Sequence, residues 1–210
     1  MPSIAGDQEP LTYVGKRPIV PVEGRWPGKT AVRIDEGFYQ GKPFAVADKS
    51  FTVEIWFRKH GQGVHLGNDR TNGMLLAQGD GYWSGLRLWS DYPAQSIRFE
   101  MGRPQPQSAF GFTAPGPVPD GVWHHLAATW DGQEMRIYLN GIPLGRTAYA
   151  GEYSPAQGPL RIGYANAGIG SLKLDVDEVA VFNRALPDAE ILRHAHFAAP
   201  LSASVEKQFL

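Results

Sequence analysis

Apolar and polar residues alternate with a period of two in several short stretches of the chain, a pattern typical of β-strands with one buried face. Strands are predicted on this basis over residues 31–34, 51–58, 74–78, 85–90, 96–101, 122–130, 134–139, 142–145, 160–163 and 172–182. The glycine-rich segments 61–73 and 79–85 are expected to be loops. The proline-rich segment 103–119 is expected to be an irregular crossing between strands.

Tight turns join three of the predicted strands. Asp131-Gly132 and Asn140-Gly141 separate the stretches 122–130, 134–139 and 142–145. Asp-Gly and Asn-Gly tolerate positive φ and therefore favour hairpin turns, which predicts a three-stranded meander. The one helical candidate is Pro187–His194, where proline opens the helix, acids follow it and bases end it. Many short strands and one brief helix favour two packed antiparallel sheets over an alternating α/β fold.

The two ends of the chain differ from its middle. Prolines stand at positions 2, 10, 18, 21 and 27, and proline cannot donate a hydrogen bond within a sheet. Residues 1–29 are therefore expected to wrap the body as loop or edge strand, residues 30–196 to form the domain, and residues 197–210 to be a tail or linker. We expect no membrane insertion, because no signal peptide is visible and no apolar stretch is long enough to span a bilayer.

Charge and cysteine content exclude several classes of function. The 210 residues include 20 basic and 21 acidic side chains, for a net charge of −1. No run of Lys and Arg builds a field for nucleic acid, so no nucleic-acid partner is expected. The absence of cysteine excludes disulfides, thiol catalysis and cysteine metal sites. A chain of this length can bury a core large enough to fold without such supports.

Five motifs carry a resemblance to a known family. They are Phe51–Phe57, Gly121–Gly132 (Gly-Val-Trp-His-His-Leu-Ala-Ala-Thr-Trp-Asp-Gly), Arg136–Gly141 (Arg-Ile-Tyr-Leu-Asn-Gly), Leu160–Gly163 and Asp177–Ile191. In this order they resemble the LamG-like jelly-roll domains of the concanavalin A-like lectin/glucanase superfamily. The resemblance implies an all-β, two-sheet antiparallel jelly-roll sandwich with one short C-terminal helix. It also implies an extracellular, periplasmic or cell-surface setting, frequent calcium, and binding of carbohydrate or protein rather than catalysis.

Aromatic residues near the glycine-rich segments are candidates for ligand binding. Sugars stack their apolar faces on aromatic rings and pair their hydroxyls with charged side chains, and such sites often lie in loops at the end of a sandwich. The candidate ligand-binding residues are Tyr82, Trp83, Trp89, Tyr92, Asp80, Arg87 and Asp91. The alternative interpretation is that the aromatic residues within strands belong to the core.

A structural calcium ion is expected only through the resemblance. Asp35, beside the first body strand, and Asp177, in the closing strand, are the candidate ligands that could meet across adjacent strands, since calcium prefers carboxylate and carbonyl oxygens. The alternative is that Asp35 makes a turn and Asp177 hydrogen-bonds the backbone. His124 and His125 should point to opposite faces of their strand, so they cannot jointly ligate one metal and are expected to be structural.

Three functions remain open at this point. The leading hypothesis is a non-catalytic module that binds carbohydrate or glycoconjugate, as part of a larger multidomain chain. The second is a structural or protein-interaction domain. The third is a glycoside hydrolase, for which Asp175, Asp177 and Glu178 offer the local carboxylates, with Asp175 and Asp177 expected on one strand face and Glu178 on the other. Laminarinase-like hydrolases of the superfamily have Glu-x-Asp-x-(x)-Glu there, and this chain has Leu174 or Lys173 in place of the first glutamate.

Overall fold

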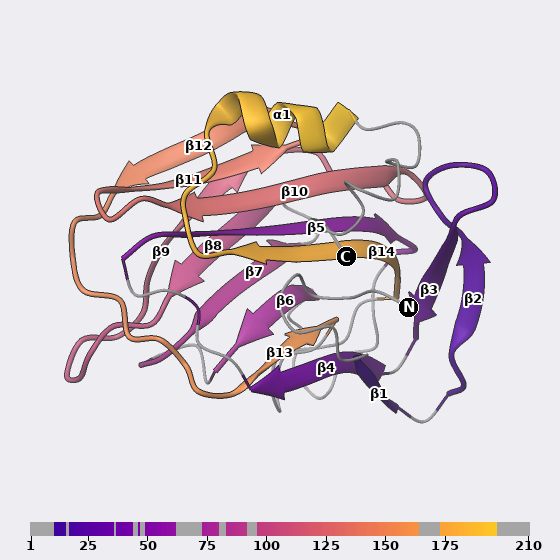
Figure 1. The fold of residues 1–210 in the computed structure, drawn as a ribbon, viewed down its shortest axis with the longest axis horizontal. Coiled ribbons are helices and arrows are strands. Elements are labelled where there is room, and N and C mark those ends of the chain that lie inside the picture. The colour runs from indigo at the N-terminus through magenta and orange to yellow at the C-terminus, as the bar shows by residue number, and fades with distance from the viewer. Residues whose placement is uncertain are drawn as a thin grey trace.

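Two seven-stranded antiparallel sheets form the body of the protein (Figure 1). The computed structural model describes residues 11–15, 17–35, 37–43, 46, 49–61, 73–79, 83–91, 96–163 and 173–196. Sheet A has the strand order β1 (Thr12–Gly15), β4 (Gly37–Pro43), β13 (Pro159–Ile162), β6 (Gly73–Gln78), β7 (Leu86–Asp91), β8 (Ser96–Met101) and β9 (Phe110–Pro115). Sheet B has the order β12 (Ile142–Ala148), β11 (Glu134–Leu139), β10 (Trp123–Trp130), β5 (Phe51–Lys59), β14 (Leu174–Phe182), β3 (Thr30–Ile34) and β2 (Val20–Glu23). The predicted all-β sandwich is confirmed.

The core lies between the inner faces of the two sheets. Alternate residues of β5, from Phe51 to Phe57, are fully buried, as the period of two predicted. They meet side chains of sheet A, and the rings of Phe51 and Phe99 lie 6.1 Å apart in an edge-on arrangement. Because these inner positions are apolar, the polar residues between them must project from the two outer faces.

The N-terminal segment supplies one edge of each sheet. β1 pairs only with β4 at the edge of sheet A, and β2 pairs only with β3 at the edge of sheet B. Figure 1 shows β1 and β2 following each other along one side of the sandwich. The prolines of this segment predicted loop or edge strand, and the described part, from Leu11, forms edge strands.

Among the described residues there is one helix, α1 (Asp188–His196), and it lies on the outer face of sheet B (Figure 1). Ile191 is fully buried and packs with Leu186 against Ala127 and Tyr138 of the sheet. The Tyr138 hydroxyl donates to Asp188 Oδ1 in the first turn at 2.8 Å, which fixes the start of the helix. Within the described part of the chain, no helix has the length and apolar character needed to cross a bilayer.

The structure corrects the sequence interpretation at two strands and one bulge. β4 was not predicted, and β9 lies inside the segment expected to be irregular. The pairing of β14 with β5 shifts between Val176 and Val179, which places two residues, Asp177 and Glu178, opposite Trp56 alone. Such a bulge breaks the simple alternation of side chains along a strand.

Candidate functional site

The outer face of sheet A carries the candidate site. Leu86 and Leu88 lie in the core, so Arg87 and Trp89 project outward from β7. Residues opposite one another in neighbouring strands share a face. The register therefore aligns one row across the sheet, namely Arg161, Ala77, Arg87, Glu100 and Gly111. It aligns a second row beside the first, namely Met74, Trp89, Arg98 and Thr113. We call these nine residues the polar face of sheet A.

Two arginines share one carboxylate on this face. Arg87 Nη2 lies 2.6 Å from Glu100 Oε2, and Arg98 Nε donates to Glu100 Oε1 at 2.5 Å. Arg98 Nη1 also donates to the Thr113 hydroxyl at 3.2 Å. Arg87 and Glu100 are almost completely buried, whereas 37% of the Arg98 side chain is exposed. The ion pairs thus hold Arg98 in place while leaving it accessible from solvent.

Trp89 lies close to both guanidinium groups. Arg87 is 5.4 Å and Arg98 5.9 Å from the centre of its ring, within the range of a cation–π interaction. The ring packs against Met74 and Ala77 and is half-buried. Its buried Nε1 finds no hydrogen-bond acceptor among the residues that the structure describes. An aromatic ring held by packing beside an exposed guanidinium is suited to hold a ligand that has both an apolar face and polar groups.

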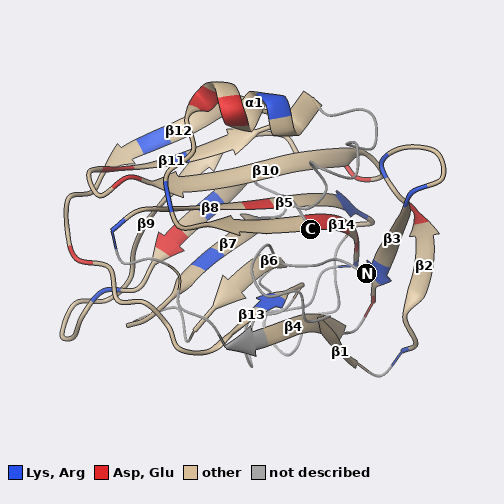
Figure 2. Ribbon diagram, in the orientation of Figure 1, with Lys and Arg blue, Asp and Glu red and all other residues tan. Residues whose placement is uncertain are grey.

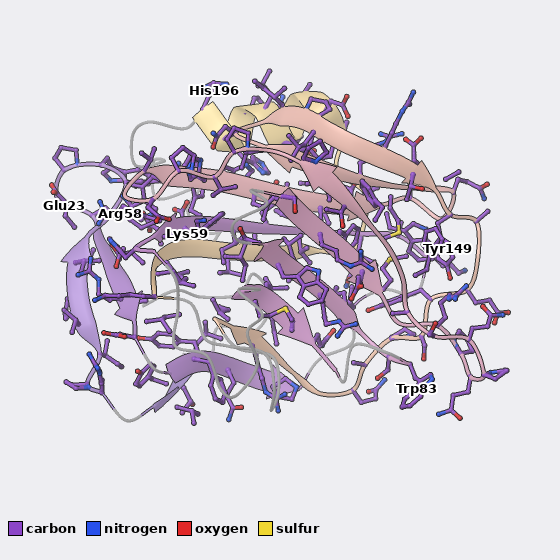
Figure 3. The ribbon with its side chains drawn as sticks, turned by 180° about the vertical axis from the view of Figure 1, so that it is seen from behind. Glu23, Arg58, Lys59, Trp83, Tyr149 and His196 are labelled. Carbon is purple, nitrogen blue, oxygen red and sulfur yellow. The ribbon has the colours of Figure 1, made fainter. Side chains whose placement is uncertain are left out.

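The predicted ligand-binding residues do not all lie together. Arg87 and Trp89 share the polar face of sheet A, but Trp83 lies three residues before β7 and is 47% exposed. At the extended rise of a strand, up to about 20 Å separates Trp83 from Trp89. Figure 3 shows Trp83 near one end of the sandwich, with Glu23, Arg58 and Lys59 near the other end.

The remaining predicted residues fall outside the description. Asp80, Tyr82 and Tyr92 are not among the described residues. Asp91 ends β7 and pairs with Ser96 through its backbone, and nothing is described of its side chain. Their role in ligand binding stays a prediction.

Three members of the polar face were missed by the sequence interpretation: Arg98, Glu100 and Arg161. Figure 2 marks basic residues on β7, β8 and β13 and an acidic residue near the end of β8. The signal for the first two was present, because Arg98 and Glu100 alternate with buried Ile97, Phe99 and Met101. The strand order that brings β13 and β8 to either side of β6 and β7 has no local signal in the sequence.

The outer face of sheet B carries a second group of charges, centred on Asp175. This carboxylate is fully buried and accepts from Arg33 Nε at 2.7 Å and from Arg58 Nε at 2.9 Å. His60 Nε2 lies 2.7 Å from the same carboxylate. Burial alone would raise the pKa of Asp175, but the hydrogen bonds from Arg33, His60 and Arg58 outweigh it and hold that pKa below its ordinary value.

Asp177 and Glu178 lie together at the bulge, which corrects the expectation that they face opposite ways. Lys29 Nζ lies 3.1 Å from Asp177 Oδ1 and also contacts Glu178. Arg25 pairs with Glu178 at 2.6 Å and stacks between the rings of Trp26 and Trp56, 4.3 Å and 4.2 Å from their centres. Burial raises the pKa of Asp177, the neighbouring Glu178 charge adds to the rise, and Lys29 opposes it.

Asp35 and Asp177, the predicted calcium ligands, lie apart in the sheet. β14 pairs with β3 so that Leu174 is opposite Ile34 and Val176 opposite Val32, which puts Asp177 level with Ala31. Asp35 lies four residues further along, roughly 13 Å away, and pairs with Arg17 at 2.9 Å and Lys173 at 3.7 Å. Among the described residues, no group of three or more His, Asp or Glu side chains could hold a metal ion. Calcium stays a prediction, which melting curves with and without EDTA would test.

The two adjacent histidines project to opposite faces, as expected from the strand. His124 points inward toward the Phe57 ring and lies 3.2 Å from the Pro119 carbonyl oxygen. His125 points outward, and its Nε2 is 3.8 Å from Glu54 Oε2, which His194 of α1 also contacts at 2.8 Å. Burial lowers the pKa of His124, so this side chain stays neutral in the folded protein at neutral pH.

A family model described as the concanavalin A-like lectin/glucanases superfamily matches residues 36–192. The chain belongs to this superfamily. The match covers most of the chain, and it begins after β1, β2 and β3, which the structure nevertheless includes in the two sheets. No curated protein sequence matches the chain.

Solved structures share the fold at low sequence identity. Domain 4 of AbnA, an extracellular GH43 arabinanase from Geobacillus stearothermophilus in complex with arabinotriose, is 17% identical, has a TM-score of 0.70 and covers 89% of this chain and 88% of its own. The CBM40 domain of the Ruminococcus gnavus IT-sialidase, bound to α2,3-sialyllactose, is 13% identical, has a TM-score of 0.60 and covers 79% and 96%. The binding domain of Paraclostridial Mosquitocidal Protein 1 is 12% identical, has a TM-score of 0.65 and covers 88% of this chain but only 47% of its own.

Proposed function

We propose that the protein is a non-catalytic glycan-binding module whose ligand lies on the polar face of sheet A. The observation that carries this proposal is Trp89, held by packing on rigid strands close to Arg87 and Arg98. A sugar ring has apolar C–H faces that stack on an indole and hydroxyl groups that hydrogen-bond to charged side chains. Strands hold such a constellation more rigidly than loops do, which reduces the ordering cost of binding.

The fold comparisons favour the same class of function. Two of the similar structures are described with bound oligosaccharides, and a third is a toxin binding domain. A shared fold alone does not assign a function, so the proposal depends on the side chains of the polar face. By the same analogy we propose that the module works outside the cytoplasm, in a larger multidomain protein.

The carboxylates of sheet B support a non-catalytic role. A glycosidase needs two carboxyl groups on either side of the scissile bond, one of them able to donate a proton. Asp175 is fully buried and bound by two arginines and a histidine, and Asp177 and Glu178 share Lys29. On the polar face of sheet A, Glu100 is the one carboxylate among the described strand side chains, and two arginines neutralise it.

Titration calorimetry with a panel of neutral and acidic oligosaccharides, including arabinotriose and α2,3-sialyllactose, tests the proposal. Truncating a tryptophan at the centre of a contact commonly weakens binding by about thirtyfold, and we expect this for Trp89→Ala. Trp83→Ala is the matched control, because Trp83 lies at the end of the sandwich. Loss of binding in Trp83→Ala alone would move the site to that end, and no binding of any glycan by the wild type would overturn the proposal.

The protein-interaction alternative has one observation in its favour. The edge strands β1 and β2 expose the apolar residues Val14 and Val20, and Ile19, just before β2, is exposed as well. Unpaired strand edges with apolar side chains can pair with a second copy of the chain. Light scattering that shows a stable dimer, together with no glycan binding, would favour this alternative.

A further inference from the structure

The charged side chains on the polar face of sheet A suit a ligand that is itself charged better than a neutral sugar. Among its described side chains, three arginines (Arg87, Arg98 and Arg161) accompany one carboxylate, Glu100. The whole chain, in contrast, has one more acidic than basic side chain. Arg87 and Arg98 share the Glu100 carboxylate, so these three side chains together carry one more positive than negative charge. Positive charge held on rigid strands attracts anions.

Arg98 is the part of this charge that a ligand can reach. A guanidinium has five N–H donors, and Arg98 uses its Nε toward Glu100 and its Nη1 toward Thr113. Its Nη2 makes no hydrogen bond to any described residue. With 37% of the side chain exposed, these N–H groups remain available to a ligand from solvent.

Glu100 and Thr113 hold the Arg98 guanidinium beside Trp89. The guanidinium carbon is 5.9 Å from the centre of the indole ring. A planar guanidinium recognises carboxylate and sulfate groups through two parallel hydrogen bonds, and such charge-assisted bonds are stronger than those to a neutral hydroxyl. A ligand that stacks on Trp89 therefore brings its substituents within the reach of Arg98.

We propose that the ligand is an acidic sugar, whose carboxylate or sulfate group binds Arg98 while its ring stacks on Trp89. This inference rests on the proposed function and adds the chemical class of the ligand. Glu100 positions Arg98 through its hydrogen bond to Arg98 Nε.

Matched ligands test the inference separately from the proposed function. Lactose, 3′-sialyllactose and 3′-sulfolactose share one disaccharide, and neutral galactotriose is compared with trigalacturonate. We expect at least one acidic ligand to bind about tenfold or more tightly than its neutral partner, with an affinity that falls as salt is raised. Comparing the affinities of the sialyl and uronate ligands with that of the sulfated ligand distinguishes a preference for carboxylate from one for sulfate.

Two variants assign the preference to Arg98. Arg98→Gln should weaken binding of the acidic ligand about tenfold more than binding of its neutral partner, and so remove the preference. Arg98→Lys should restore part of the preference, because lysine keeps the charge but not the planar fork. Equal binding of acidic and neutral partners would overturn this inference and leave the glycan-binding proposal intact. Absence of binding to every ligand would overturn both. An acidic preference that Arg98→Gln leaves unchanged would also contradict the inference.

Discussion

Both outer faces of the sandwich carry arginines and carboxylates, but the two faces differ in how these charges are paired. On sheet B, Asp175 is surrounded by Arg33, Arg58 and His60, and the bulge carboxylates share Lys29 and Arg25. On sheet A, Arg87, Arg98 and Arg161 accompany Glu100, and a half-buried tryptophan lies among them.

In this fold, the charges with a structural role and the charges proposed to bind a ligand differ in how their side chains are paired. On sheet B, cations surround the buried carboxylates, and Arg25 stacks between two tryptophans. Together with the hydrogen bond from Arg58 to the Glu23 carbonyl, these contacts connect β2, β3, β5 and β14 to each other. On sheet A, Arg98 is partly exposed, and its remaining N–H groups make no further hydrogen bond to the described residues. We therefore expect substitutions on sheet B to change stability and substitutions on sheet A to change binding.

The largest effect is expected for Asp175→Asn. Removing one member of a buried ion cluster leaves the other charges without their counter-ion, and a loss of roughly 3 kcal/mol of unfolding free energy is expected at pH 7. Urea denaturation measures it. Asp35→Asn is the matched control, since Asp35 pairs with a half-exposed arginine, and exposed pairs contribute about 1 kcal/mol or less.

The same variant gives a pH test. The pKa of Asp175 is held below its ordinary value of 3.8. The carboxylate therefore contributes stability above that value, and this contribution is lost as the pH falls through the lowered pKa. The difference between wild type and Asp175→Asn should shrink in acid. A difference that is constant from pH 7 to pH 3 would contradict an electrostatic origin.

A smaller loss is expected for Arg25→Met. The variant keeps much of the side-chain volume between Trp26 and Trp56 but removes the cation–π interactions and the ion pair with Glu178. A desolvated cation–π contact contributes about 2 kcal/mol, so we expect a loss of that order in thermal or urea melting. Arg17→Met, at an exposed ion pair, serves as the control. Equal losses of stability in the two variants would contradict the distinction between the buried and the exposed pair.

A still smaller effect is expected from His124. Burial lowers its pKa in the folded state, so below the ordinary histidine pKa of about 6.5 the unfolded chain binds a proton that the folded chain does not. Stability should therefore fall as the pH is lowered from 7.5 to 5.5. His124→Gln cannot take up that proton, and it should show a flatter dependence in the same range. Parallel pH curves for the two proteins would contradict this account.

The smallest change in stability is expected for Arg98→Gln, about 0.5 kcal/mol or less, because its side chain is partly exposed. This variant tests the difference between the two faces directly, since it should lose affinity for an acidic ligand at nearly unchanged melting temperature. Asp175→Asn should do the reverse and keep its affinity wherever it remains folded. If both variants lost stability and affinity together, the two faces would not be separate in function.

Local patterns in the sequence predicted most of the fold. The alternation in β5 and β8 and the Asp-Gly and Asn-Gly turns around β11 each depend on neighbours in the chain. β4 was missed because Gly37, Gly41 and Pro43 hide the alternation of apolar and polar residues in a short strand. β9 was missed because prolines lie on either side of Phe110 and hide the alternation there. The bulge at Asp177 and Glu178 depends on pairing with β5, which no neighbouring residue specifies.

The candidate site was predicted less completely for the same reason. Arg87 and Trp89 were found because aromatic and charged residues lie close together in the sequence beside a glycine-rich segment. Arg98, Glu100 and Arg161 reach the same face only through strand order and register, which bring β13, β6, β7 and β8 side by side. Contacts between strands distant in the chain are determined by tertiary packing, and a single sequence does not display them.

The position of β1, β2 and β3 has a practical consequence for how this domain is delimited. The superfamily match begins at residue 36, yet the preceding strands contribute an outermost strand to one sheet and two strands to the other. A recombinant protein trimmed to the match would leave the hydrogen-bonding rims of β4 and β14 bare, and would separate Asp175, Asp177 and Glu178 from Arg33, Arg25 and Lys29. Expression boundaries for this protein therefore belong upstream of Thr12.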